Sequence, residues 1–284
     1  MRQRSISAIG VVAIGLVPAI LGGWIFGVVF TAIVAIAYWE AVAITDRHRT
    51  PLRWIGLAIV VVAGLLATWH DTDRTLLGII AGAVFLPLAA AVFISHTHGN
   101  DHWVTTTTTS LYLALPAWAA ISLRQSEAFP ARDWLQNLAG WFPGTSTLTG
   151  GGLAWLLLAL LVTWLSDTFA FVVGKSVGRT KLAPRVSPNK TVEGALGGLV
   201  AAGLIALFCN WAFGMQIGPG WATVIGVGLG LVGQIGDLSE SMLKRARGVK
   251  DSGHLIPGHG GMLDRIDALI FILVATWLIA PLVN

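Results

Sequence analysis

The amino-acid sequence predicts an all-α, polytopic integral membrane protein with about nine transmembrane helices and a cytoplasmic N-terminus. The composition is the first reason, because 55% of the 284 residues are hydrophobic and only 11% are charged. Soluble proteins carry about 25% charged residues. The second reason is a succession of long apolar runs, and the third is the uneven distribution of lysine and arginine between them. These features exclude an ordinary soluble protein.

The apolar runs define the expected spans, since a helix needs about 20 mainly apolar residues to cross a bilayer. The first run follows two arginines and resembles a signal peptide. We expect a retained span instead, because the run is long and a second follows almost at once. The expected spans are 6–24, 26–44, 54–70, 75–95, 104–123, 152–173, 195–214, 221–238 and 263–283.

Two regions are expected along the chain. Residues 1–150 would form N-terminal scaffold helices that could also give lipids access, and 151–284 a catalytic membrane region with cytoplasmic motif loops. Neither a long polar domain nor an internal repeat is evident. Cys209 is the single cysteine, which rules out an intramolecular disulfide and a cysteine-based metal site.

The basic residues orient these spans, because cytoplasmic loops are enriched in lysine and arginine. With nine spans and the N-terminus inside, the outer segments hold only Arg74, Arg124 and Arg132, and the other 15 of the 18 basic residues are cytoplasmic. Anionic lipid accounts for the net charge of +4 without nucleic acid. The inner residues are Arg2, Arg4, Arg47, Arg49, Arg53, Lys175, Arg179, Lys181, Arg185, Lys190, Lys244, Arg245, Arg247, Lys250 and Arg265.

The stretch 241–267 concentrates charge and glycine between two apolar segments. Charge at a bilayer edge is costly unless it is paired, hydrated or bound to an ion, so this cluster indicates a functional site. Its basic side chains and glycine-rich backbone suit phosphate, and its carboxylates suit Mg²⁺. If the last two spans are antiparallel neighbours, Asp237 and Asp264 reach the same depth, and Asp267 follows on the face of Asp264.

Several of these residues also have a structural interpretation. Glu240 and Lys244 have the spacing of a helical ion pair, Asp167 could form a hydrogen bond between packed helices, and His259 could be a neutral structural histidine. His96, His98 and His102 are better explained by a hydrated loop than by a metal site. A cytoplasmic loop that merely follows the positive-inside rule would explain the basic residues of 241–267, but it would not explain three aspartates at the edges of spans.

The residues of this stretch resemble, position for position, the signature of phosphatidate cytidylyltransferases. Ser187–Gly194 (SPNKTVEG) resembles a second block of that family, and Asp167, Gly174 and Gly178 resemble its lead-in. The resemblance is close over the C-terminal 120 residues or so. The signature is carried by Ser241, Lys244, Arg245, Lys250, Asp251, Gly253, Pro257, His259, Gly260, Gly261, Asp264, Arg265 and Asp267.

The resemblance implies an enzyme that transfers the cytidylyl group of CTP to phosphatidic acid, with Mg²⁺ alone or together with a second cation. Membrane lipids would be the other partners, nucleic acid would not be one, and the choice between monomer and homodimer stays open. The implied catalytic residues are Asp237, Lys250, Asp251 and Asp264, and the metal ligands Asp237, Asp264, Asp267 and Asp167. Ser187, Lys190, Ser241, Lys244, Arg245, His259, Gly260, Gly261 and Arg265 would bind substrate.

Two other functions are compatible with a polytopic chain of this kind. One is related chemistry on another lipid, such as an ether lipid phosphate or a polyprenol phosphorylated by CTP. The other is a transporter whose intramembrane aspartates carry a cation, which discontinuous helices or repeat symmetry would favour. Neither feature is evident in the sequence. The implied location is the plasma or inner membrane of the cell, with the active site facing the cytoplasm.

Overall fold

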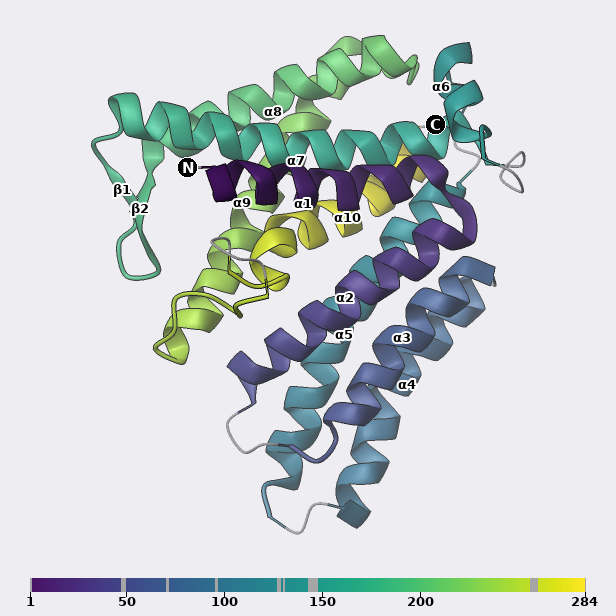
Figure 1. Ribbon diagram of the computed structural model, residues 1–284, viewed down its shortest axis with the longest axis vertical. Coiled ribbons are helices and arrows are strands. Elements are labelled where there is room, and N and C mark those ends of the chain that lie inside the picture. Colours follow the sequence, from purple (N-terminus) through teal and green to yellow (C-terminus); the bar gives the residue numbers. More distant parts are fainter. Residues whose placement is uncertain are drawn as a thin grey trace.

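The computed structural model describes residues 2–46, 50–69, 72–94, 97–126, 129, 131–142, 148–255 and 260–283, and of 2–9 and 11 only the backbone. Within them the chain is almost entirely helical (Figure 1). The elements are α1 (Arg2–Leu21), α2 (Gly23–Thr45), α3 (Arg53–Trp69), α4 (Asp73–Ile94), α5 (Gly99–Gln125), α6 (Asp133–Ala139), α7 (Gly150–Val177), β1 (Lys181–Ala183), β2 (Ser187–Thr191), α8 (Val192–Phe213), α9 (Pro219–Ala246) and α10 (Leu263–Val283).

Every expected span coincides with one of the long helices, which confirms an all-α membrane protein. In the described residues, six helices are long and apolar enough to cross a bilayer by length and composition: α2, α4, α7, α8, α9 and α10. The helix α3 has only 17 residues, and α5 carries the polar run Thr105–Thr109. The number of nine spans therefore stays a prediction.

The structure adds two elements that the sequence pattern did not predict. The short helix α6 lies in the stretch expected to be an outer loop, and β1 and β2 pair as an antiparallel hairpin between α7 and α8. The helix α9 also continues to Ala246, eight residues past the expected end of its span. Its last turns are polar, and a helix can extend beyond the apolar layer because its backbone hydrogen bonds are internal.

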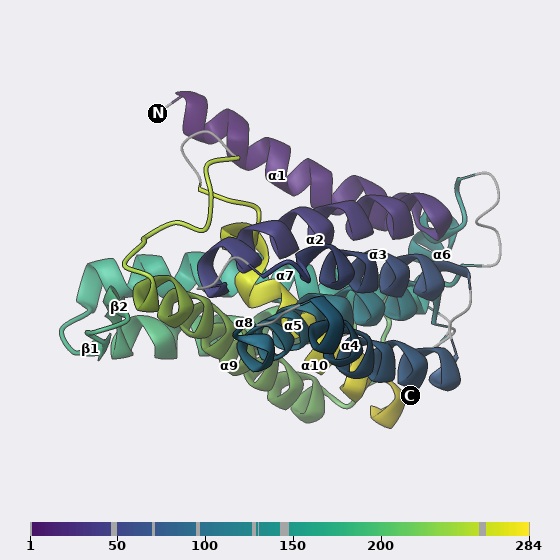
Figure 2. The same ribbon diagram turned by 90° about the horizontal axis from the view of Figure 1, so that it is seen from below.

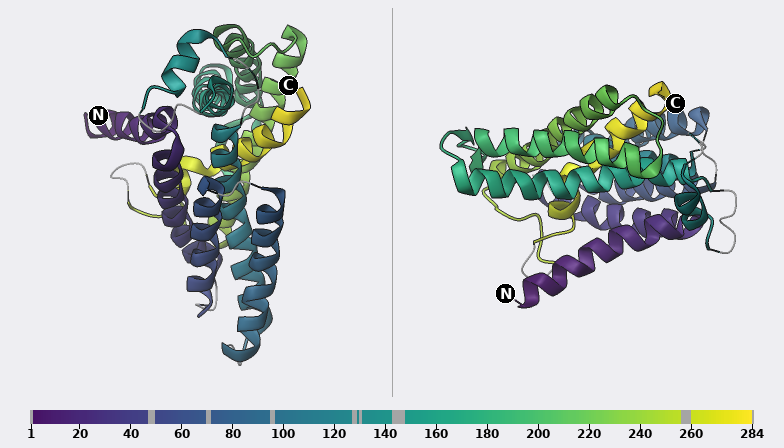
Figure 3. Two further views of the ribbon diagram at one scale, coloured as in Figure 1. Left: turned by 90° about the vertical axis from the view of Figure 1, so that its right-hand side faces the viewer. Right: turned by 90° about the horizontal axis from the view of Figure 1, so that it is seen from above.

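The helices form two groups that cross one another. Helices α2 to α5 run side by side, while α7, α8, α9 and α10 pack together across one end of that group (Figure 1). In the left view of Figure 3, α7 is seen end-on while α2 to α5 run along the page. The helix α1 lies at the edge of the molecule beside α2 (Figure 2).

The two motif loops lie at the same end of the molecule. The hairpin and the segment after α9 are on the left in Figure 1, whereas α6 and the C-terminus are on the right. Contacts support this arrangement, since Arg245 Nε donates to Val186 O at 3.2 Å and Lys190 reaches Asp237. The end that carries α6 would therefore face away from the cytoplasm in the predicted orientation.

Arg124 is a buried structural residue rather than a loop charge. Its side chain is 0% exposed. Its Nε donates to Ala19 O at 2.8 Å, and its Nη2 to Ile20 O and Ala139 O, both at 3.3 Å. Arg124 thereby satisfies carbonyl groups at the C-terminal ends of α1 and α6, which have no partner within their own helices. Its charge contributes little to orientation by the positive-inside rule.

We expect Arg124→Gln to destabilise the protein by at least about 2 kcal/mol, because hydrogen bonds to a charged group contribute about 1.5–3 kcal/mol each. Arg132→Gln is the matched control, since within the described residues that exposed side chain donates one hydrogen bond, to Trp211 O, and lies over the Trp211 ring. Thermal unfolding in detergent measures both. Equal melting temperatures for the two variants would contradict the structural role of Arg124.

The fold also predicts which residues are labelled from which side of a membrane. In a Cys209→Ala background, we expect a cysteine at Lys181 to react from the cytoplasmic side and one at Asn137 from the opposite side. Both positions are exposed and lie at opposite ends of the molecule. Labelling of intact cells and of inverted vesicles with an impermeant thiol reagent measures this. Reaction of both cysteines from one side would overturn the orientation.

Candidate active site

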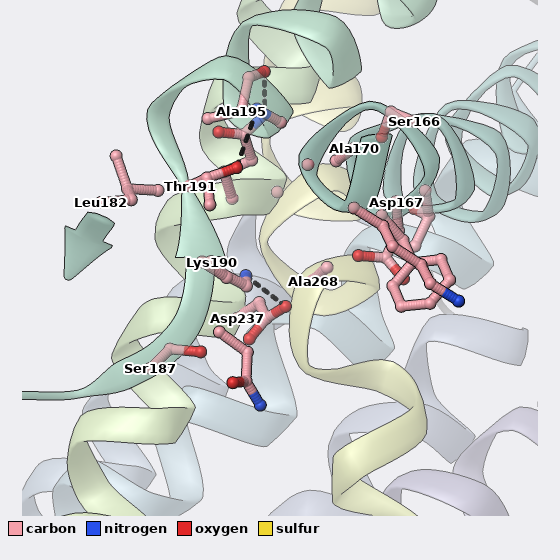
Figure 4. A pocket seen from close by; sticks show the side chains of 18 of the residues that line it. Ser166, Asp167, Ala170, Leu182, Ser187, Lys190, Thr191, Ala195, Asp237 and Ala268 are labelled. Carbon is pink, nitrogen blue, oxygen red and sulfur yellow. Dashed lines mark hydrogen bonds and ion pairs between the residues drawn. The ribbon is translucent and has the colours of Figure 1, made fainter. Parts of the chain in front are cut away.

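A cavity of about 610 Å³ lies between α7, the hairpin and helices α8, α9 and α10. Its wall is mostly apolar toward the helices, whereas charged side chains from three elements reach into it (Figure 4). These residues come from both motif regions of the sequence. The lining consists of Thr163, Ser166, Asp167, Ala170, Phe171, Gly174, Lys175, Leu182, Ser187, Asn189, Lys190, Thr191, Gly194, Ala195, Gly233, Gln234, Asp237, Ala268 and Ile272.

The hairpin is held over the cavity by the start of α8. Thr191 is the N-cap, and its Oγ1 accepts a hydrogen bond from Gly194 N at 3.1 Å. The carboxylate of Glu193 accepts from Arg179 N at 3.0 Å and from Thr180 N at 3.1 Å, where the chain leaves α7. These bonds fix the base of the hairpin, so that β2 places Ser187 and Lys190 at the cavity.

The shortest polar contact in the cavity joins the two motif regions. Lys190 Nζ lies 2.5 Å from Asp237 Oδ2, and both side chains are about one quarter exposed. Ser241, one helical turn beyond Asp237, donates from Oγ to Asp237 Oδ1 at 3.4 Å. Asp167 projects from α7 into the same cavity (Figure 4). The structure thus brings Asp167, Ser187, Lys190 and Asp237 together.

A second charged cluster lies beside the cavity but does not line it. Lys244 Nζ forms an ion pair with the fully buried Glu240 and another with Asp264 Oδ1 at 2.6 Å. Asp264 Oδ2 also accepts from Ser252 N at 2.9 Å and from Gly261 N at 2.8 Å. Asp237 and Asp264 therefore have different partners. The helical pair Glu240–Lys244 is present and is extended by Asp264.

Glu40 on α2 belongs to this region, although sequence reasoning did not select it. Its Oε1 accepts from Met262 N at 3.0 Å, and its Oε2 accepts from Leu263 N at 2.8 Å and from Ser252 Oγ at 2.9 Å. The available signal was an acidic residue within an apolar span, which usually marks a functional position. Its partners lie more than 200 residues away, so the sequence did not reveal them.

The other predicted residues have varied surroundings. Lys250 and Asp251 are exposed, and so is Arg245, whose Nη1 donates to Val249 O at 2.9 Å. Asp267 lies within electrostatic reach of Asp237 and Glu240. Gly260 has a φ of +79° and approaches the Asp264 carboxylate closely, a position that favours glycine. His259 lies outside the described residues.

Arg265 lines a separate apolar pocket of about 60 Å³ between α1, α2, α7 and α10. Its guanidinium Nε is buried and makes no hydrogen bond within the described chain. Arg265 also lies within electrostatic range of Asp167 in the large cavity. Arg265 therefore lines the apolar pocket while its charge remains within range of the large cavity.

The donor atoms of the large cavity fit a hard cation. Asp167 and Asp237 supply carboxylate oxygens, and Ser187, Asn189 and Gln234 supply neutral ones. Mg²⁺ prefers oxygen ligands and keeps several waters, so one or two carboxylates with substrate phosphates suffice. Among the described residues, no group of three or more acidic, histidine or cysteine side chains is arranged to hold a metal without such help. The assignment of ligands stays a prediction.

Comparison with known proteins agrees with this arrangement. The chain is similar to the phosphatidate cytidylyltransferases of Bacillus subtilis (30% identical, covering 96% of this chain and 95% of that protein) and Synechocystis (31%, covering 95% and 92%). A shorter match of 122 residues to the one from Staphylococcus saprophyticus is 47% identical and covers 43% of this chain and about half, 47%, of that relative. The model of the cytidylyltransferase family matches residues 2–283. Because this match spans both helix groups and the cavity between the motif regions, the chain belongs to the cytidylyltransferase family.

Proposed function

We propose that this protein transfers the cytidylyl group of CTP to phosphatidic acid, forming CDP-diacylglycerol and pyrophosphate on the cytoplasmic side of the cell membrane. The observation that carries the proposal is the cavity in which Lys190 and Ser187 from the hairpin face Asp167 on α7 and Asp237 on α9. A cavity of about 610 Å³ among apolar helices, with charged side chains reaching into it, suits a water-soluble nucleotide that must meet a lipid headgroup.

The reaction needs positioned charge more than a covalent intermediate. An oxygen of the lipid phosphate attacks the α-phosphorus of CTP, the bond to the β-phosphate oxygen breaks, and pyrophosphate leaves with that electron pair. Mg²⁺, alone or with a second cation, would be held by Asp237 and Asp167 and would neutralise phosphate charge. Asp267 would add negative charge near Asp237. Asp264 would act indirectly, by holding the signature loop in place.

The residues of the chain would do the rest of the positioning. Lys190 would move from Asp237 to a CTP phosphate once the Asp237 carboxylate binds another cation. Ser187 would donate a hydrogen bond to the same phosphate. Ser241 would hold the Asp237 carboxylate in place. Lys250 and Arg245 are exposed at the cytoplasmic end, where they would attract the triphosphate.

The lipid would approach from the side of Arg265. Its guanidinium stands at the apolar pocket formed with Phe26, Trp164 and Leu269, and its Nε has no hydrogen-bond partner within the described chain. A guanidinium group binds phosphate oxygens strongly in such surroundings. The acyl chains would stay against the apolar helices while Arg265 draws the headgroup toward the cavity.

Turnover should depend on the Asp237 carboxylate. We expect Asp237→Asn to lower the rate of CDP-diacylglycerol formation at least about tenfold, which corresponds to roughly 1.4 kcal/mol, and to raise the Mg²⁺ concentration needed for half-maximal rate. The amide keeps the shape but loses the charge. The assay follows pyrophosphate release and lipid-linked cytidine in the purified protein.

Asp133→Asn is the control for this experiment, since Asp133 lies on α6 at the other end of the molecule. Its rate should equal that of the wild type. An Asp237→Asn protein that keeps more than about a tenth of the rate at ordinary Mg²⁺ would remove Asp237 from the metal site. A folded wild type that releases no pyrophosphate with CTP, Mg²⁺ and phosphatidic acid would overturn the proposed function.

A second comparison separates substrate binding from general surface charge. We expect Lys250→Ala to raise the KM for CTP or lower kcat by about tenfold or more, because Lys250 lies in the signature loop beside Asp251. Lys181→Ala removes the same charge from an exposed position in the hairpin, outside the cavity lining, and should change the rate little. Equal losses in both variants would mean that these lysines act only through attraction to anionic lipid.

A further inference from the structure

Glu40 connects the N-terminal helices to the signature loop. It lies on α2, five residues before the end of that helix. Its carboxylate accepts three hydrogen bonds, from Ser252 Oγ at 2.9 Å, Met262 N at 3.0 Å and Leu263 N at 2.8 Å. Two of these donors are backbone N–H groups at the start of α10, where the helix has no internal acceptor and a negative charge is favourable.

Two glycines of the signature make room for this carboxylate. A Cβ atom at Gly253 would lie 2.6 Å from Glu40 Oε1, and one at Gly261 would collide with both Glu40 Oε2 and Ser252 Oγ. Both glycines are therefore needed for close approach to Glu40. Neither has a positive φ, so the conformational freedom of glycine is not the reason for them.

Asp264 completes the arrangement from the opposite side. It accepts from Ser252 N and Gly261 N, so that Ser252 is bound by Glu40 through its hydroxyl and by Asp264 through its backbone. The two carboxylates bring Ser252 next to Gly261 and Met262. Lys250 and Asp251 immediately precede Ser252 in the chain, and Asp264 and Arg265 come shortly after Met262.

We propose that Glu40 is a positioning residue for the cytidylyl transfer: it holds Ser252 and the start of α10 and thereby sets where Lys250, Asp251 and Arg265 stand relative to the cavity. This inference rests on the proposed function. It makes the N-terminal helices a part of the active site rather than a scaffold alone. Glu40 itself does not line the cavity.

The chemistry of the site requires a carboxylate with the reach of glutamate. Both oxygens act as acceptors, Oε1 for one donor and Oε2 for two. A glutamine offers one acceptor oxygen and turns its NH₂ group toward an N–H or O–H donor. An aspartate is one methylene shorter. Both substitutions leave donors near the loop without a partner.

The first experiment measures catalysis by the purified full-length protein. We expect Glu40→Gln to lower kcat/KM by about 10- to 100-fold, the range set by losing a hydrogen bond to a charged acceptor. Asp73→Asn is the control, because Asp73 is an exposed carboxylate in the first turn of α4 and not at the loop. Its kcat/KM should stay within about twofold of the wild type.

A double-substitution cycle separates positioning from a general loss of structure. Ser252→Ala removes only the hydroxyl that donates to Glu40. We expect the Glu40→Gln, Ser252→Ala protein to have the same kcat/KM as Glu40→Gln alone, because the bond between them is already lost. Losses that multiply would show that Glu40 and Ser252 act independently of one another and would overturn the inference.

The last measurement does not depend on catalysis. A spin label on a cysteine at the exposed Leu255, in a Cys209→Ala background, reports how firmly the loop is held. We expect greater label mobility in Glu40→Gln and no change in Asp73→Asn. If the wild type transfers no cytidylyl group, the proposed function fails while the loop result still stands. If Glu40→Gln keeps wild-type kcat/KM or leaves the label unchanged, the positioning role is wrong.

Discussion

The ion pairs of Lys244 with Glu240 and Asp264 are the interactions on which the functional end of the molecule depends. Glu240 is fully buried, and Lys244 is 8% exposed, so neither charge is well hydrated. Removing one member of such a buried pair generally costs about 3–5 kcal/mol, because the other charge is left without a partner. Asp264 also binds Ser252 N and Gly261 N. One set of charges therefore joins α9 to α10 and closes the signature loop.

The cavity depends in turn on how closely the helices approach. A Cβ atom at Gly194 would lie 2.6 Å from Ala170 O, and one at Gly198 would lie 3.0 Å from Ser166 O. Small residues allow helices to pack with their backbones close together where no hydrophobic effect drives association. Because α7 and α8 meet so closely, the hairpin between them emerges at a defined place, and Lys190 reaches Asp237 on α9. Backbone contact thus sets the position of the charged residues.

The sequence predicted much of the fold and part of the site. Long apolar runs predicted the helices, because a bilayer requires about 20 such residues and leaves little choice of structure. The family resemblance placed Lys190, Ser187, Asp167 and Asp237 among the expected site residues, and these four line one cavity. In the structure Lys190 pairs with Asp237 and Lys244 with Asp264, and a common metal site for the two aspartates stays a prediction. Depth along antiparallel helices did not reveal which way each side chain turns.

Composition and local pattern therefore determined the membrane class and the helical segments, since these depend on transfer of nearby residues into an apolar medium. The family motifs are strings of residues in the sequence itself. Tertiary structure alone decided which charges pair. The sequence pattern predicts an outer loop charge at Arg124, but its side chain binds carbonyl groups at the ends of α1 and α6. Glu40 was one acid in an apolar helix, and its donors follow more than 200 residues later. Hydrogen bonds act over about 3 Å in space, and no spacing along the chain indicates which distant groups the folded helices bring within that distance.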